Sequence, residues 1–208
     1  MRVPILSNPT IGEIAARLLQ EHGLEATLPV DVEVLIERDL KLDIVPLPGF
    51  GVRGIDGLLS QDRTTIYVDE SIQRNVATRY RFTLAHELGH SVLHSDLIES
   101  HLQETGDKPL MLWETLSEDE YRHAERQANV FAANLLMPAL HLEAQFQAVS
   151  ERLATAGKTF DVLDSFAKMK VLRAMSSIFV VSPDALRIRL IREGLISDFE
   201  NPEKDPRA

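Results

Sequence analysis

The chain has 208 residues, of which 44% are hydrophobic and 26% are charged, a balance typical of globular proteins and not of disordered or membrane-embedded chains. Its formal net charge of -10 argues against non-specific coating of nucleic acid, which requires clustered Lys and Arg. Because there is no cysteine, disulfides and thiolate metal sites are excluded, and any metal ion must be held by His and carboxylate side chains.

The N-terminal sequence carries one positive charge but lacks the apolar segment of a signal peptide. The longest aliphatic or aromatic runs, such as Ile178 to Val181, are far too short to cross a bilayer. We therefore expect a soluble, cytoplasmic protein without a membrane association.

The first third of the chain predicts two helices and a small sheet. Thr10 to Glu13 has capping-box spacing and predicts a helix that ends at Gly23, and a second short helix is expected after Pro29. Strands are expected at residues 42–47, 57–60 and 64–68. We expect these strands to form an antiparallel sheet, in which the strand at 64–68 is an edge strand and could pair with an extended peptide.

From Ser71 onward the pattern is helical, apart from a loop expected at residues 99–112. Ser117 to Glu120 is a second capping box, and the helix that it opens is stopped by Pro138. Other helices are expected at about 75–95, 138–156, 161–173 and 183–194, the last with Ser182 as its N-cap. A sheet followed by helices predicts an α+β fold.

The expected helix at 75–95 contains the sequence His-Glu-Leu-Gly-His at positions 86–90. The four-residue spacing places His86 and His90 on one helix face, close enough to share a metal ion. Glu87 projects about 100° away from His86, beside the ion, where a carboxylate can accept a proton from an activated water. This pattern predicts a zinc site with Glu87 as the catalytic base, although a helix whose histidines bind nothing would show the same spacing.

A catalytic zinc site needs a third protein ligand. The downstream candidates are His94, His101, Glu104, Glu114, His123, Glu125 and His141. Glu125 is favoured, because it lies in the second turn of a capped helix with Asn129 four residues on to orient its carboxylate, but a solvated acidic helix start would look similar. A straight helix cannot place three successive turns around one ion, so His94 is expected behind the ligands.

Two long motifs resemble the ImmA/IrrE family of metallo-endopeptidases. They are Arg81 to His90 followed by Leu93-His94, and Glu125 to Pro138. Weaker likenesses at residues 29–33, 57–59 and 66–69 extend the resemblance over about residues 29–138. It implies a zincin-like helical core with the small sheet packed on it, zinc held by His86, His90 and Glu125, and Glu87 as the base.

The resemblance also implies a function. Members of this family typically cleave a helix-turn-helix repressor of the Xre type, and this switches on stress, phage or mobile-element genes. The expected domains are a zinc peptidase at residues 1–138, a C-terminal helical region at 139–200, and a disordered tail at 201–208. A non-catalytic zinc-containing regulator that binds a repressor or DNA is the alternative, and a housekeeping protease is a third.

The C-terminal region matches the family less well. Its ending, from Val181 to Leu190 and then Gly194 to Ile196, resembles the helix-turn-helix-like segment of family members, whereas the part at 170–179 is longer than usual. Basic residues accumulate here, namely Lys168, Lys170, Arg173, Arg187, Arg189 and Arg192. They could contact DNA or an acidic partner, but the acidic chain favours a solvated helix face.

Overall fold

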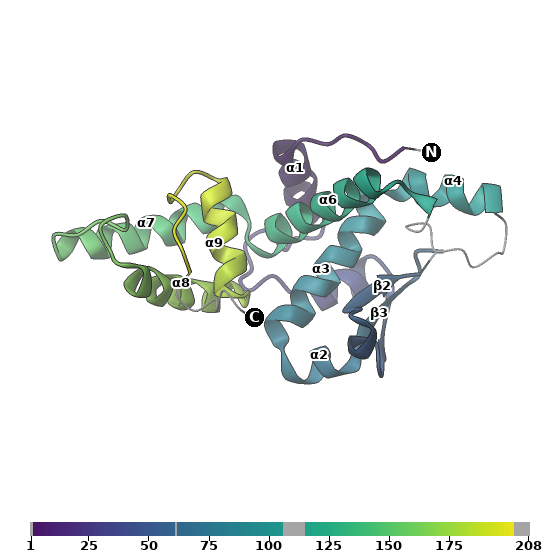
Figure 1. Ribbon diagram of the computed structural model, residues 1–208, viewed down its shortest axis with the longest axis horizontal. Coiled ribbons are helices and arrows are strands. Elements are labelled where there is room, and N and C mark those ends of the chain that lie inside the picture. The colour runs from purple at the N-terminus through teal and green to yellow at the C-terminus, as the bar shows by residue number, and fades with distance from the viewer. Residues whose placement is uncertain (1, 61, 106–114, 202–208) are drawn as a thin grey trace. The chain divides into compact units, whose positions relative to one another are not determined.

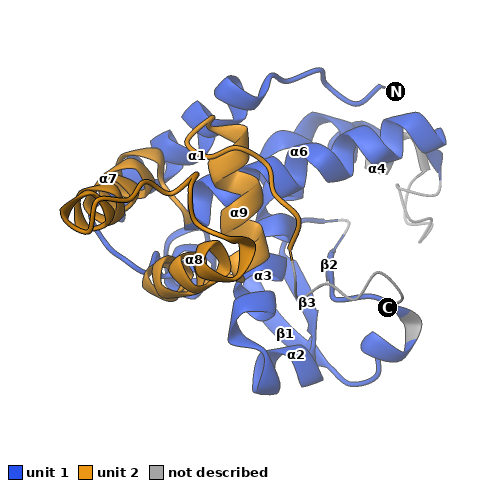
Figure 2. Ribbon diagram, turned by 60° about the vertical axis from the view of Figure 1, so that its left-hand side comes forward, with its two compact units in different colours: residues 1–136 blue, residues 137–208 orange. Residues whose placement is uncertain are grey.

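The structure, a computed structural model, describes residues 2–60, 62–105 and 115–201. The chain forms two compact units, residues 1–136 and residues 137–208 (Figure 2). Apart from Asn201, the tail predicted to be disordered lies outside the described residues. Within the described part, no helix combines the length and the apolar character that a bilayer-spanning segment needs.

The first unit contains five α-helices among its described residues: α1 (Asn8–Glu21), α2 (Glu70–Asn75), α3 (Ala77–Leu93), α4 (Ser95–Thr105) and α6 (Glu118–Leu136) (Figure 1). The short helix expected after Pro29 is a π-helix, Val34–Asp39. Helix α1 begins before the predicted capping box, because the Ser7 hydroxyl accepts the Thr10 N–H and Pro9 suits the first turn.

The sheet has the order β1-β3-β2, with β1 at Asp43–Leu47, β2 at Gly57–Leu59 and β3 at Thr65–Asp69. Strands β2 and β3 form the predicted antiparallel hairpin, but β1 pairs with β3 in parallel, so the predicted all-antiparallel sheet is wrong. The chain reverses twice between β1 and β3, which restores its direction, and β3 lies next to β1. Strand β3 is therefore central and β1 and β2 are the edge strands, contrary to the expectation for residues 64–68. The α+β class is confirmed.

Helices α3 and α6 pack against each other closely (Figure 1). Their contact depends on small residues, because a Cβ at Gly89 would lie 3.1 Å from the Phe131 ring and 3.2 Å from the Ala128 Cα. Ala124 and Ala132 on α6 are also fully buried. The close approach brings functional side chains of α3 within reach of those of α6.

The loop expected at residues 99–112 is wrong for residues 99–105, which belong to α4. This helix starts at Ser95, buries Leu97 and Ile98, and continues to Thr105. The rest of the expected loop lies outside the described residues.

The second unit consists of α7 (Ala139–Thr155), α8 (Ser165–Phe179) and α9 (Pro183–Arg192). Helix α8 starts later than predicted because Asp164 is its N-cap, and it ends where Val180 adopts a left-handed conformation with φ 52°. The Ser182 hydroxyl then accepts the Ala185 N–H and caps α9 as predicted.

Two of the six basic residues noted in the C-terminal region, Arg187 and Arg189, are largely covered in this unit. The Arg189 side chain is buried and forms an ion pair with Glu193. Arg187 pairs with Asp184 and Asp198 and is largely covered. The exposed basic face is therefore smaller than the sequence suggests.

Candidate metal centre

Helix α3 places the two histidines of the motif on one face, as the four-residue spacing predicts. Their Nε2 atoms lie 3.1 Å apart, and the rings meet edge to face with centroids 4.8 Å apart. His90 is 2% exposed. Burial therefore lowers the pKa of His90 to about 4, and its imidazole is neutral at physiological pH.

Glu125 reaches the same point from α6. Its Oε1 lies 3.1 Å from the His90 Nε2, and its Oε2 lies 3.4 Å from the His86 Nε2. Helix α6 begins with the predicted capping box, in which Ser117 and Glu120 exchange hydrogen bonds. Among the described residues, His86, His90 and Glu125 are the group whose ligand atoms converge closely enough to hold a metal ion.

The distances between these donor atoms suit a tetrahedral cation. Zinc–ligand bonds of about 2.0–2.1 Å separate the ligands of a tetrahedral site by about 3.3 Å, and the three observed separations are 3.1, 3.1 and 3.4 Å. Two imidazole nitrogens and a carboxylate are also the ligand types that zinc prefers in the absence of cysteine. The residues present therefore fit the metal ion that the sequence motif predicts.

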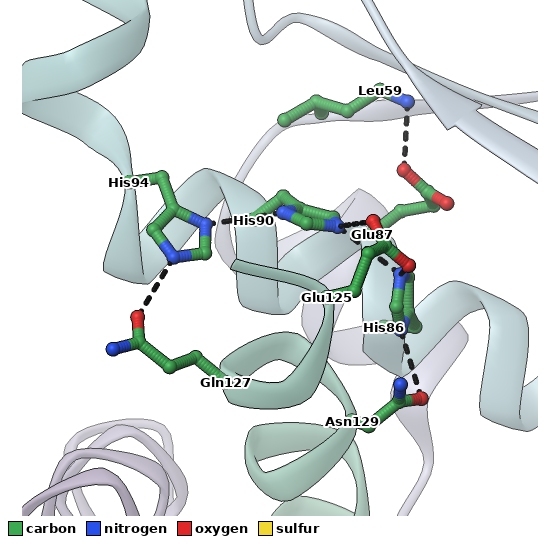
Figure 3. A network of polar contacts seen from close by, with 8 residues as sticks. All are labelled: Leu59, His86, Glu87, His90, His94, Glu125, Gln127 and Asn129. Carbon is green, nitrogen blue, oxygen red and sulfur yellow. Dashed lines mark hydrogen bonds and ion pairs between the residues drawn. The ribbon is translucent and has the colours of Figure 1, made fainter. Parts of the chain in front are cut away.

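Glu87 points away from this convergence and contacts the sheet. Its Oε2 accepts a hydrogen bond of 2.9 Å from the backbone N–H of Leu59 on β2 (Figure 3). Gly57 permits this contact, because a Cβ at that position would lie 2.5 Å from the Thr83 Cγ2 and 3.2 Å from the Glu87 Cγ. Burial raises the pKa of Glu87 to about 7, so this carboxyl can both accept and release a proton near neutral pH.

The other ring nitrogens of the two histidines have partners behind the centre (Figure 3). The His86 Nδ1 lies 3.2 Å from the Asn129 Oδ1, and the His90 Nδ1 lies 3.1 Å from the Nδ1 of His94. Asn129 therefore contacts the ring of His86, whereas the sequence analysis expected it to orient the carboxylate of Glu125, and His94 lies behind His90.

Gln127 is a further buried partner in this network that the sequence did not predict. Its Oε1 lies 3.0 Å from the His94 Nε2, and its side chain is 2% exposed. Because Gln127 is two residues from Glu125, it points to another face of α6, and no spacing rule links it to the metal motif. Its burial appears only in the fold.

The remaining candidate ligands lie elsewhere. His123 contacts Gln127, and neither His101 nor His141 belongs to the converging group. The side chains of Glu104 and Glu114 lie outside the described part of the chain.

A cavity of about 620 Å³ opens over His86, Glu87, His90 and Glu125. Leu58 and neighbouring residues of β2 line one wall, and Phe82 contributes an apolar surface from α3. Tyr121 also lines it, one helical turn before Glu125 on α6 and 41% exposed. The centre is thus accessible to a large ligand.

Comparison with known proteins points to a family of peptidases. Residues 50–170, more than half of the chain, match the peptidase family model described as the IrrE N-terminal-like domain. The radiation response metalloprotease IrrE of Deinococcus radiodurans is 27% identical over 190 residues, which are 88% of this chain and 50% of that protein. The chain therefore spans about half the length of this curated relative.

A solved structure, described as a Mycobacterium tuberculosis transcriptional regulator, has a similar fold, with a TM-score of 0.53 and 17% identity. The match covers 86% of this chain and 46% of that one. The family match spans both long motifs, and its peptidase character agrees with the converging His86, His90 and Glu125. The chain belongs to the ImmA/IrrE family of metallopeptidases.

Proposed function

We propose that this protein is a zinc-dependent endopeptidase that cleaves a helix-turn-helix repressor of the Xre type and thereby derepresses stress, phage or mobile-element genes. The observation that supports catalysis most directly is the separation of Glu87 from the three converging side chains. Glu87 lies beside the centre and lines the cavity, and its carboxylate accepts a hydrogen bond from the Leu59 N–H.

His86, His90 and Glu125 would hold the ion. When bound, zinc supplies Lewis-acid activation of a water molecule and of the scissile carbonyl. Glu87 accepts the proton of the attacking water and later delivers it to the leaving amine. Its raised pKa suits both transfers, since the group is poised near neutral pH.

Tyr121 is the side chain best placed to stabilise the oxygen that becomes negative during attack. Its phenol lines the cavity together with Glu87 and Glu125, and the spacing of four residues puts it on the same face of α6 as Glu125. A hydroxyl donor aimed at a developing oxyanion lowers the barrier more than it strengthens substrate binding.

Strand β2 offers a binding edge for an extended substrate. Backbone groups of Asp56 and Ser60 bond β3, so the alternation along the strand directs the backbone groups of Gly57 and Leu59 away from it. Of these outward groups, the Leu59 N–H already donates to Glu87. Because Gly57 also lines the cavity, a peptide added at this edge would run past the metal site.

The non-catalytic alternative requires a fourth protein ligand that closes the site. Neither His94 nor His123 takes that position, since each contacts Gln127 instead. This arrangement supports an enzyme. A repressor substrate also fits the expected cytoplasmic location.

The test is cleavage of an Xre-type repressor from the same organism, beginning with any that is encoded beside the gene for this protein. Zinc-loaded wild-type protein and Glu87→Gln are incubated with it, and the products are identified by mass spectrometry. We expect one discrete cut by the wild type and none by Glu87→Gln. Equal cleavage by both proteins would remove Glu87 as the base, and a wild type that leaves the repressor intact but degrades unfolded proteins would indicate a housekeeping protease.

A further inference from the structure

A chain of hydrogen bonds runs from the N-terminal segment to the metal centre. It starts at the backbone carbonyl of Pro4, which lies 2.7 Å from the Gln127 Nε2. It continues from the Gln127 Oε1 to the His94 Nε2 at 3.0 Å, and from the His94 Nδ1 to the His90 Nδ1 at 3.1 Å. Gln127, His94 and His90 are each 2% exposed or less, so water does not compete strongly for these contacts.

The carbonyl of Pro4 fixes the direction of this chain. A backbone carbonyl can only accept a hydrogen bond, so the amide nitrogen of Gln127 must face Pro4. The second N–H of the same amide faces the His123 Nε2 at 2.9 Å, which then acts as an acceptor. The Gln127 oxygen is therefore the atom that faces His94, and it can only accept.

The same logic determines which ring nitrogens carry protons. Since the Gln127 oxygen accepts, His94 must be protonated at Nε2. Burial disfavours the imidazolium form, so the Nδ1 of His94 carries no proton and accepts from the Nδ1–H of His90. His90 then directs an unprotonated Nε2 at the converging atoms, which is the form that binds a metal ion.

We propose that Gln127 is a positioning residue that sets the proton positions of His94 and His90 from the backbone of the N-terminal segment. This inference rests on the proposed metal site at His86, His90 and Glu125. It assigns a role to Pro4 as well, because its carbonyl anchors the amide that orients the chain. Residues in such positions behind metal ligands typically change metal affinity about 10–100-fold when they are replaced.

The first test is the protonation of the His94 ring, read by nitrogen NMR of the wild-type protein with and without zinc. We expect a proton on Nε2 and none on Nδ1 in both states. The reverse pattern would overturn the inference. This reading does not require bound metal, so it is independent of whether the proposed zinc site is correct.

The second test measures zinc affinity by competition with a chelator. Gln127→Met keeps the length of the side chain but removes its hydrogen bonds, and we expect its Kd for zinc to rise about 10–100-fold with loss of the single His94 tautomer. Asn134→Ala is the control, because Asn134 is also a buried amide of α6 but bonds only its own helix, at the Val130 carbonyl, among the described contacts. The control should lose stability and keep zinc affinity. An unchanged Kd and tautomer in Gln127→Met would contradict the inference.

Discussion

The backbone N–H of Leu59 donates a hydrogen bond of 2.9 Å to the carboxylate of Glu87, so the edge strand β2 holds the proposed base in place. This contact joins β2 to α3 at the wall of the cavity. The strand that would align a substrate also fixes the group that would move its protons.

Replacement of Glu87 by Gln should abolish catalysis and preserve the metal site. The amide can still accept the Leu59 N–H but cannot take a proton, so we expect kcat to fall by about 10²–10⁴-fold. Zinc content should remain at the wild-type level, because Glu87 is not among the converging ligands. Loss of zinc in this variant would show that Glu87 holds the ion.

Gly57→Ala should separate β2 from α3. The added methyl group meets the Thr83 Cγ2 at 2.5 Å and the Glu87 Cγ at 3.2 Å, so the strand must move, at a cost of about 1–3 kcal/mol in unfolding free energy. We expect a strong loss of cleavage with little change in zinc content. Gly51→Ala is the control, since its methyl group would make only ordinary contacts of 3.5 Å with Asp69. Equal activity of the two variants would contradict the role of the Leu59 contact.

Gly89→Ala should weaken the metal site itself. Its methyl group would lie 3.1 Å from Phe131 and 3.2 Å from the Ala128 Cα, forcing α3 and α6 apart. Because the histidines and Glu125 come from different helices, we expect weaker zinc binding together with a lower melting temperature, measured by chelator competition and thermal unfolding. Zinc affinity equal to that of the wild type would show that the helix separation does not control the centre.

Tyr121→Phe should lower kcat and leave KM and zinc content nearly unchanged. Loss of one oxyanion donor typically costs about 10²–10³-fold in kcat. A change confined to KM would indicate that the phenol only binds substrate.

Metal binding should weaken on acidification. Burial disfavours the charged form of His86, but its contacts with Glu125 and the nearby Glu87 outweigh this and raise its pKa. A metal ion requires the neutral imidazole, so zinc competes with this proton and its affinity should fall as the pH drops through the raised pKa. Zinc titrations at pH 8, 7 and 6 measure the effect, and an affinity independent of pH over this range would contradict it.

The sequence predicts the parts of the site that depend on local spacing. His86 and His90 share a face because four residues make about one helical turn, and the capping box at Ser117 starts the helix that carries Glu125. The partner of β1 was not predictable, because alternation defines the faces of a strand and says nothing of its neighbour. Gln127 and the Leu59 contact depend on packing between distant segments, which no local pattern encodes.

The central claim is that His86, His90 and Glu125 form one zinc site. Its most direct test is the metal content of the purified protein, measured by plasma mass spectrometry for the wild type and for Glu125→Ala. The account predicts one zinc ion per wild-type chain and a large loss in the variant. A wild-type protein that binds no zinc, or a Glu125→Ala variant that binds it equally well, would contradict the account.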